Sequence, residues 1–266
     1  MALLFLPNTA GDRATAQDNT GSGATATGYD VKNLIAGPRQ ASNGWRSTAS
    51  SGASGVGYQI ATDTDIDHIV IARADWLLTE NTMRVKGRKR DSGGTWTDIS
   101  GFDKNPIVAA DLIGPKAQDL VIAVDVDTSL RGVGISADPV AGTEAVQISK
   151  LYGAIAFTFD PLTVPSREAT WEDLPPGTYY EPLLGSRPYE VERRFTLTFE
   201  AVTMAQIENF KAIPQLFYWP FFLYDQNADL WKWKLEHVIL EGFEVSVRTN
   251  LYYDLTINFL RLRHYD

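Results

Sequence analysis

The chain has 266 residues, of which 44% are hydrophobic and 21% are charged, and its formal net charge is −9. This composition is that of a globular protein with one large domain or two ordinary ones, and it excludes a disordered chain. An acidic surface repels phosphate, so no nucleic acid is expected as the main partner. The absence of cysteine fits a reducing compartment, or an assembly stabilised by subunit contacts.

The N-terminal sequence MALLFLP has no basic region before its apolar run, which is far shorter than the ~20 residues that cross a bilayer. It predicts a short strand in a protein made in the cytoplasm, with no membrane-spanning segment. Small and polar residues then dominate from residue 8 to about residue 57, which favours turns and extended loops. A disordered arm and loops at the end of a β-sandwich are both compatible with this composition. We assign residues 1–29 to an N-terminal strand and a loop-rich arm.

Apolar and polar residues alternate repeatedly in the next region, residues 30–159, which predicts short strands. The stretch DHIVIARAD places Ile69 and Ile71 on one face, and DSGG predicts a turn between TMRVKGRKR and TWTDI. We interpret the basic run GRKR as the exposed end of a hairpin, with a polyanion site as the alternative. Short strands with turn signals between them indicate an antiparallel sandwich or barrel.

Residues 160–188 contain six prolines and no sustained period, which predicts a linker with limited structure. Residues 189–266 form a second β-rich region with one short helix. In that helix Thr203 and Gln206 fit a capping box, and Pro214 is expected to end it. Met204, Ile207 and Phe210 are expected on one helical face.

No catalytic or cofactor motif is present. The histidines His68, His237 and His264 are far apart in the sequence, and there is no G-x-S-x-G turn. The sequence also lacks a phosphate-binding loop ending in Lys-Ser/Thr and a G-x-G-x-x-G after a strand. We therefore predict no enzyme activity, no catalytic residue and no cofactor.

Two acidic clusters require weighing: Asp63, Asp65 and Asp67, and then Asp125 and Asp127. Alternate carboxylates on a strand share one face and could gather around Ca²⁺. They could also be the paired carboxylates of a glycosidase. The interpretation that we prefer is a solvated strand edge whose charges prevent edge pairing. No metal site is predicted.

The order of these motifs resembles a discoidin-type, galactose-binding-like jelly-roll β-sandwich over about residues 30–154. The matching residues are Trp45, Ser47, Ile66, Ile69, Ile71, Trp96, Ile99, Ile148, Leu151, Tyr152 and Gly153. In this family ligands bind through loops at one end of the sandwich. The resemblance therefore makes Arg39, Gln40, Trp45 and Arg46 the possible ligand residues. It also implies that Trp45 packs against the sandwich, with a sugar-stacking role as the alternative.

The stretch FTLTFEAVTMAQIENFKAIPQLFYWPFFLYD resembles a segment of tail and baseplate proteins of tailed bacteriophages, over about residues 189–264. The resemblance implies a structural component of a phage tail tip or baseplate, located in the virion. Its partners would be other tail proteins and further copies of the chain in a ring, with a host-surface glycan as a possible contact. Fold analogy alone does not prove function.

Consecutive aromatic residues in this second region predict a strand that is covered on both faces. They are Phe217, Tyr218, Trp219, Phe221 and Phe222, and parity would place Tyr218 and Phe222 on one face. One face would be covered by the domain core and the other by a neighbouring subunit, because aromatic residues are typical of interface cores. The alternative is a strand buried on both faces within one domain.

Three classes of function remain open. The first, which we prefer, is the structural tail protein. The second is a carbohydrate-binding module that recognises a bacterial surface glycan. The third is a glycan-cleaving enzyme that uses Asp63, Asp65, Asp125 or Asp127.

Overall fold

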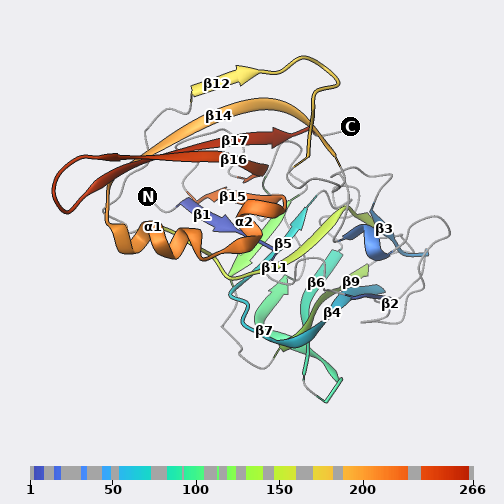
Figure 1. The fold of residues 1–266 in the computed structure, drawn as a ribbon. Coiled ribbons are helices and arrows are strands. Elements are labelled where there is room, and N and C mark those ends of the chain that lie inside the picture. Colours follow the sequence, from blue (N-terminus) through green and yellow to red (C-terminus); the bar gives the residue numbers. More distant parts are fainter. Residues whose placement is uncertain are drawn as a thin grey trace. The chain divides into compact units, whose positions relative to one another are not determined.

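The computed structural model describes residues 3–8, 15–18, 31–34, 44–48, 54–72, 83–91, 93–104, 113, 119–123, 130–139, 147–159, 170–181, 188–226 and 235–263. The predicted fold class, mostly β, is confirmed (Figure 1). The chain forms two compact units. One, the seven-stranded unit, contains Met1–Asn8 and Ala156–Arg263, and the other, the sandwich unit, contains Thr9–Ile155.

The seven-stranded unit is one antiparallel sheet in the order β1-β15-β16-β17-β14-β12, with β13 also paired to β14. Its strands are β1 (Leu3–Leu6), β12 (Thr170–Asp173), β13 (Tyr179–Tyr180), β14 (Tyr189–Val202), β15 (Phe221–Asp225), β16 (Leu235–Val247) and β17 (Tyr253–Leu262). The alternation predicted for β14 is confirmed, because Phe195, Leu197 and Phe199 are buried while Thr196 and Thr198 are half-buried. One face of the sheet therefore carries the apolar core.

Phe5 lies at the centre of this core. Its ring centroid is 5.8 Å from that of Phe159, 5.8 Å from that of Phe210 and 6.2 Å from that of Phe259. The backbone of Phe5 also exchanges two hydrogen bonds with Phe157, of 2.8 and 2.9 Å. The first strand of the chain is thus built into the seven-stranded unit.

Helix α1 (Met204–Lys211) confirms the predicted helix and its cap. The backbone N–H of Gln206 donates to Thr203 Oγ1 at 3.3 Å, and the Thr203 N–H donates to Gln206 Oε1 at 2.9 Å. Ile207 and Phe210 are buried, whereas Met204 is 43% exposed. Pro214 does not simply end the helical region, because it is the first residue of a second helix, α2 (Pro214–Tyr218).

The division into units differs from the prediction at two places. Strand β1, expected in an N-terminal arm, pairs with β15, so that Phe5 opposes Leu223. Part of the expected linker forms strands, since β12 and β13 both pair with β14. Prolines excluded a long regular element there, but two- and four-residue edge strands fit between them.

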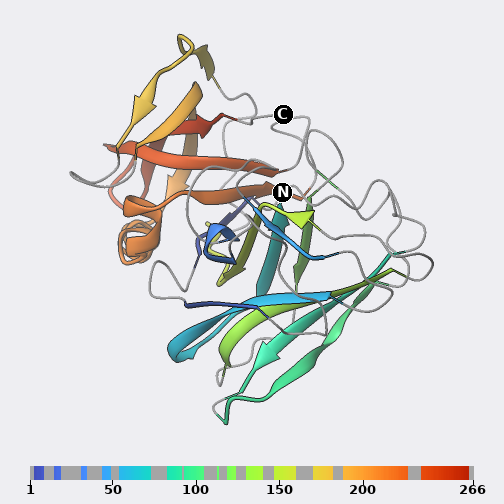
Figure 2. The ribbon, with the colours of Figure 1, turned by 90° about the vertical axis from the view of Figure 1, so that its right-hand side faces the viewer.

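The sandwich unit contains a five-stranded sheet in the order β2-β4-β9-β6-β7 and a three-stranded sheet in the order β11-β5-β8. The first consists of β2 (Thr15–Asp18), β4 (Ser54–Thr64), β6 (Met83–Arg90), β7 (Trp96–Lys104) and β9 (Leu130–Pro139). The second consists of β5 (His68–Ala72), β8 (Leu120–Ala123) and β11 (Lys150–Ala154). Strands β3 (Trp45–Arg46) and β10 (Gln147–Ile148) pair separately, and a short 3₁₀ helix covers Val31–Leu34. The two larger sheets lie in separate layers (Figure 2).

Candidate functional site

The predicted ligand loop is only partly described. Arg39 and Gln40 lie outside the described residues. Trp45 is 0% exposed and pairs with Ile148, so its ring packs within the sandwich unit and cannot stack on a ligand. This confirms the packing interpretation of Trp45. Arg46 is exposed.

The predicted aromatic interface is not one continuous strand. Phe217 and Tyr218 belong to α2, which breaks the alternation on which the shared face of Tyr218 and Phe222 depended. Phe221 and Phe222 are buried within the chain, and the Phe222 ring stacks on His237 at a centroid distance of 4.4 Å. Tyr218 is 45% exposed, and Trp219 is half-buried. The backbone turn at Pro214 lets one domain cover most of these rings.

Of the two acidic clusters, the structure describes the side chains of Asp65 and Asp67 only, and no group of three or more metal-ligating side chains is found among the described residues. Asp65 is exposed, whereas Asp67 Oδ1 lies 2.7 Å from Nδ1 of its neighbour His68. The side chain of Asp63, together with Asp125, Asp127 and His264, falls outside the described part. Within the described residues, no helix is both long and apolar enough to cross a membrane.

A second polar group of residues lies on the β6–β7 hairpin, whose turn the DSGG sequence predicted. The Gly94 N–H donates to the Asp91 carbonyl at 3.1 Å, and the Thr95 N–H donates to Asp91 Oδ1 at 2.8 Å. Gly94 has a φ of +90°, which favours glycine. This closed turn fixes the register in which β6 and β7 present their side chains.

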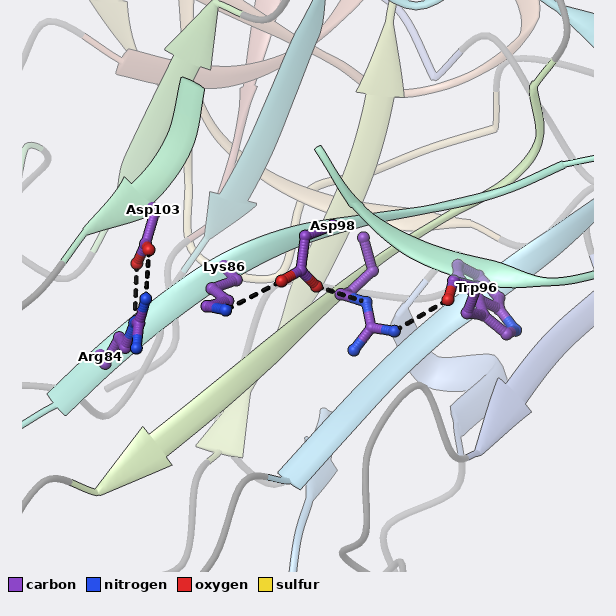
Figure 3. Close-up of polar contacts among 6 residues, drawn as sticks. Arg84, Lys86, Trp96, Asp98 and Asp103 are labelled. Atoms are coloured by element: carbon purple, nitrogen blue, oxygen red, sulfur yellow. Dashed lines mark hydrogen bonds and ion pairs between the residues drawn. The ribbon is translucent and has the colours of Figure 1, made fainter. Parts of the chain in front are cut away.

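The hairpin carries a ladder of ion pairs (Figure 3). Arg84 Nε donates to Asp103 Oδ1 at 2.8 Å, and Lys86 Nζ donates to Asp98 Oδ2 at 2.8 Å. Arg88 lies across the same carboxylate, with Nε 3.0 Å from Asp98 Oδ1. The hydrogen bond from Arg84 lowers the pKa of the Asp103 carboxyl below its ordinary value. The Asp103 carboxylate therefore stays ionised at neutral pH.

Trp96 completes the group. Its carbonyl accepts a hydrogen bond of 3.0 Å from Arg88 Nη2, and its indole is half-buried. A Cβ atom added to Gly57 would lie 2.9 Å from Trp96 Cη2 and 2.6 Å from the Val133 carbonyl oxygen. Glycine at position 57 thus allows the indole to lie against the backbone of β4.

Strand pairing places these residues on the outer face of the five-stranded sheet. Val56 and Ile135 pair and are both buried, so the next pair, Gly57 with Gly134, faces outward. Arg88 pairs with Gly134 of β9 and with Asp98 of β7, and because paired residues point to the same face of a sheet, Arg88 and Asp98 also face outward. We call Arg84, Lys86, Arg88, Arg90, Trp96, Asp98 and Asp103 the β6–β7 face.

The β6–β7 face combines one aromatic ring with charged donors and acceptors. A tryptophan offers a large rigid apolar surface at a low cost in conformational entropy. The guanidinium and ammonium groups donate hydrogen bonds, and the carboxylates accept them. This set suits a ligand that has an apolar face and hydroxyl groups at its edge, as a sugar ring does.

The sequence contained a signal for this site that our interpretation did not use. Arg84, Lys86, Arg88 and Arg90 alternate along one strand, and a predicted turn connects them to Trp96 and Asp98. Only Arg88 and Arg90 fall in the basic run that we interpreted as a hairpin end, and Lys86 lies next to it. The close approach of the indole to Gly57 depends on the position of β4 beside β9, and both strands are distant from Trp96 in sequence.

No family model and no curated protein matches the chain. Solved structures that resemble it include a Ruminococcus gnavus GH29 fucosidase in complex with fucose, at 15% identity and a TM-score of 0.42. This match covers 56% of the chain and 27% of the fucosidase. A Streptococcus pneumoniae fucose binding module matches at 9% identity and a TM-score of 0.40, covering 56% of the chain and 95% of the module.

CpGH89CBM32-5 from Clostridium perfringens, in complex with GalNAc-β-1,3-galactose, matches at 11% identity and a TM-score of 0.40. It is covered over 99% of its length and covers 57% of this chain. At these TM-scores, the ligand of this chain has to be inferred from its own residues.

Proposed function

We propose that the chain is a non-catalytic, glycan-binding protein that holds its ligand on the β6–β7 face of the sandwich unit. This proposal favours the carbohydrate-binding alternative of the sequence analysis over the structural one. It moves the binding residues from the sandwich-end loop to the outer face of the five-stranded sheet.

The observation that carries the proposal is the position of Trp96. The Cη2 edge of its indole lies close to Gly57 on the outer face of the sheet, and Trp96 is only half-buried, so part of its surface is accessible to a ligand. Asp98 lies two residues after Trp96 on the same strand, where it pairs with Arg88 and contacts the side chains of Lys86 and Arg88. A sugar stacked on the ring would therefore place its hydroxyl groups within reach of both acceptors and donors.

Replacement of Trp96 by alanine is expected to weaken glycan binding by at least about 10-fold, because the stacking surface is lost; stacking on aromatic rings is worth roughly 1–3 kcal/mol where it has been measured for bases. The matched control is Trp171→Ala, which removes a half-buried tryptophan of the seven-stranded unit. Glycans bound by the parent are first found on a glycan array, and affinities are then measured by isothermal titration calorimetry. Equal affinities of the parent and Trp96→Ala, or no glycan bound by the parent, would contradict the proposal.

A different surface supports a second candidate function, assembly with other proteins, of which the structural subunit of a phage tail tip or baseplate in a virion is the form that the sequence suggested. The β16–β17 hairpin extends beyond the neighbouring strands (Figure 1) and exposes Val247 by 76% and Leu251 by 73%. The tip is ordered by Arg248, whose Nη1 lies 2.6 Å from Glu200 Oε2 and 3.1 Å from Asp254 Oδ1. Apolar residues on an ordered, exposed tip are typical of surfaces that contact other proteins.

If this tip joins subunits, the double variant Val247→Asp, Leu251→Asp is expected to shift the protein to monomer. The charges would have to be desolvated in the contact. Sedimentation velocity of the parent and the variant measures this shift, with Tyr179→Asp as a control because Tyr179 is 62% exposed elsewhere in the unit. A parent that is already monomeric at all concentrations would remove the support for self-assembly.

A further inference from the structure

We propose that Arg90 is the specificity-determining residue of the β6–β7 face, where its guanidinium donates hydrogen bonds to two adjacent hydroxyl groups of the sugar that stacks on Trp96. This inference rests on the proposed glycan-binding function and names the ligand group that the site selects. It follows from how the cations of the face are engaged, from the turn that supports Arg90 and from the neighbouring charges.

Arg90 differs from the other cations of the face in its contacts. Arg84 donates to Asp103, Lys86 and Arg88 contact Asp98, and Arg88 also donates to the Trp96 carbonyl (Figure 3). Arg90, by contrast, forms no hydrogen bond or ion pair with any residue that the structure describes. A guanidinium has five N–H donors and no acceptor. The donors of Arg90 can therefore bind ligand oxygen atoms without first breaking a contact of the protein.

The β6–β7 turn supports the side chain of Arg90. A Cβ atom added to Gly94 would lie 2.8 Å from Arg90 Nη2 and 3.5 Å from its Cζ, so the half-buried guanidinium packs directly on this glycine. The φ of +90° at Gly94 strains any residue with a side chain. The turn is closed by the hydrogen bond of 3.1 Å from the Gly94 N–H to the Asp91 carbonyl. The guanidinium therefore lies on an ordered surface of the hairpin.

Strand pairing places Arg90 next to Trp96. The two residues pair in register across β6 and β7, and paired residues point to the same face of a sheet. From this common level the guanidinium of Arg90 extends to Gly94 in the turn, and the indole of Trp96 extends to Gly57 of β4. A sugar on the accessible part of the indole therefore has the guanidinium at its edge, where its hydroxyl groups lie.

The charges around Arg90 favour hydroxyl groups over an anionic group. Asp91 follows Arg90 in the chain and is exposed, and Asp98 lies two residues after Trp96. These two carboxylates would repel an anion, whereas a neutral hydroxyl group can accept from Arg90 and donate to a carboxylate. A guanidinium presents its donors as a rigid fork, which fits two neighbouring oxygen atoms better than one. Hydroxyl groups on adjacent carbon atoms meet both requirements.

The test compares sugars that differ by one hydroxyl group. The full chain is titrated, with NMR detection, with the methyl glycosides of galactose, glucose, mannose and fucose and with the monodeoxy derivatives of each. We expect at least one methyl glycoside to bind. Two of its monodeoxy derivatives, which lack hydroxyl groups on adjacent carbon atoms, should bind at least about 5-fold more weakly, because a hydrogen bond to a charged donor is lost in each.

Variants of Arg90 assign this discrimination to its guanidinium. Arg90→Gln should bind the complete sugar at least about 5-fold more weakly and should bind the two monodeoxy derivatives as well as it binds the complete sugar. Arg90→Lys, which keeps the charge but loses the fork, should discriminate against one of the two derivatives at most. Both variants should keep the melting temperature of the parent. The matched control is Arg193→Gln, at an exposed arginine of the seven-stranded unit that contacts Asp173, and it should change neither affinity nor discrimination.

The outcomes separate this inference from the proposed function. If Trp96→Ala loses a sugar while Arg90→Gln binds it and discriminates as the parent does, the role of Arg90 is wrong and glycan binding stands. If no methyl glycoside and no array glycan binds, both are wrong. If the methyl glycoside of galacturonic acid binds at least 10-fold more tightly than that of galactose, and Arg90→Gln abolishes this preference, Arg90 selects a carboxylate and the assignment to hydroxyl groups is overturned.

Discussion

Replacement of Phe5 by alanine is expected to lower the free energy of unfolding of the seven-stranded unit by about 3–5 kcal/mol. Phe5 is 0% exposed, and its ring contacts six other phenylalanines. The variant leaves a cavity whose walls come from β14, β15, β17, α1 and the segment before β12. Several separate elements would have to move together to close it, so most of the packing energy of the ring is lost. Chemical denaturation measures the change, and hydrogen exchange assigns it to this unit.

Tyr179→Ala is the control for Phe5→Ala, since it truncates an exposed aromatic residue of the same unit and should cost less than about 0.5 kcal/mol. If Phe5→Ala unfolds at the same denaturant concentration as the parent, β1 does not belong to the core of the unit. That result would favour the arm that the sequence composition predicted for residues 1–29.

Replacement of Trp45 by alanine is expected to destabilise the sandwich unit by about 3–5 kcal/mol. Trp45 is among the largest side chains with no exposed surface, and its strand holds β10 through the pair with Ile148. Thermal melting with and without a bound glycan is the measurement. The melting temperature should fall in both conditions, while the affinity of the fraction that remains folded should not change.

Trp96→Ala provides the contrast within the same unit. Its indole is half-buried, so truncation should cost less stability than truncation of Trp45 but should remove binding. If Trp45→Ala keeps the melting temperature of the parent and loses the ligand, the stacking alternative for Trp45 would be correct and the assignment of the site to the β6–β7 face would be wrong.

Local patterns predicted the local structure well. Thr203 and Gln206 marked the start of α1, because a capping box satisfies the donors of the first helical turn with residues three apart. Asp91 and Gly94 marked the β6–β7 turn for the same reason, since both contacts lie within five residues. In both cases the hydrogen bonds that form the structure join residues of the same short segment whose sequence predicted it.

Pairings between distant segments were not predicted. Strand β1 pairs with β15, and nothing in the run LLFL indicates a partner more than 200 residues later. The candidate site was missed for the same reason. Its cations and Trp96 are visible in the sequence, but the glycine beneath the indole comes from another strand, and the outward direction of the face depends on which neighbours are buried.

The bridge between Phe5 and Phe157 has a consequence for how this chain can vary. Because these two residues are hydrogen-bonded neighbours, the chain leaves the seven-stranded unit after Asn8 and returns at Ala156 across the width of one strand pair. The sandwich unit is therefore an insertion between two neighbouring backbone positions of the seven-stranded unit. A short loop joining Asn8 to Ala156 would preserve every described strand of the seven-stranded unit, and another domain whose two ends lie close together could take the place of the sandwich unit.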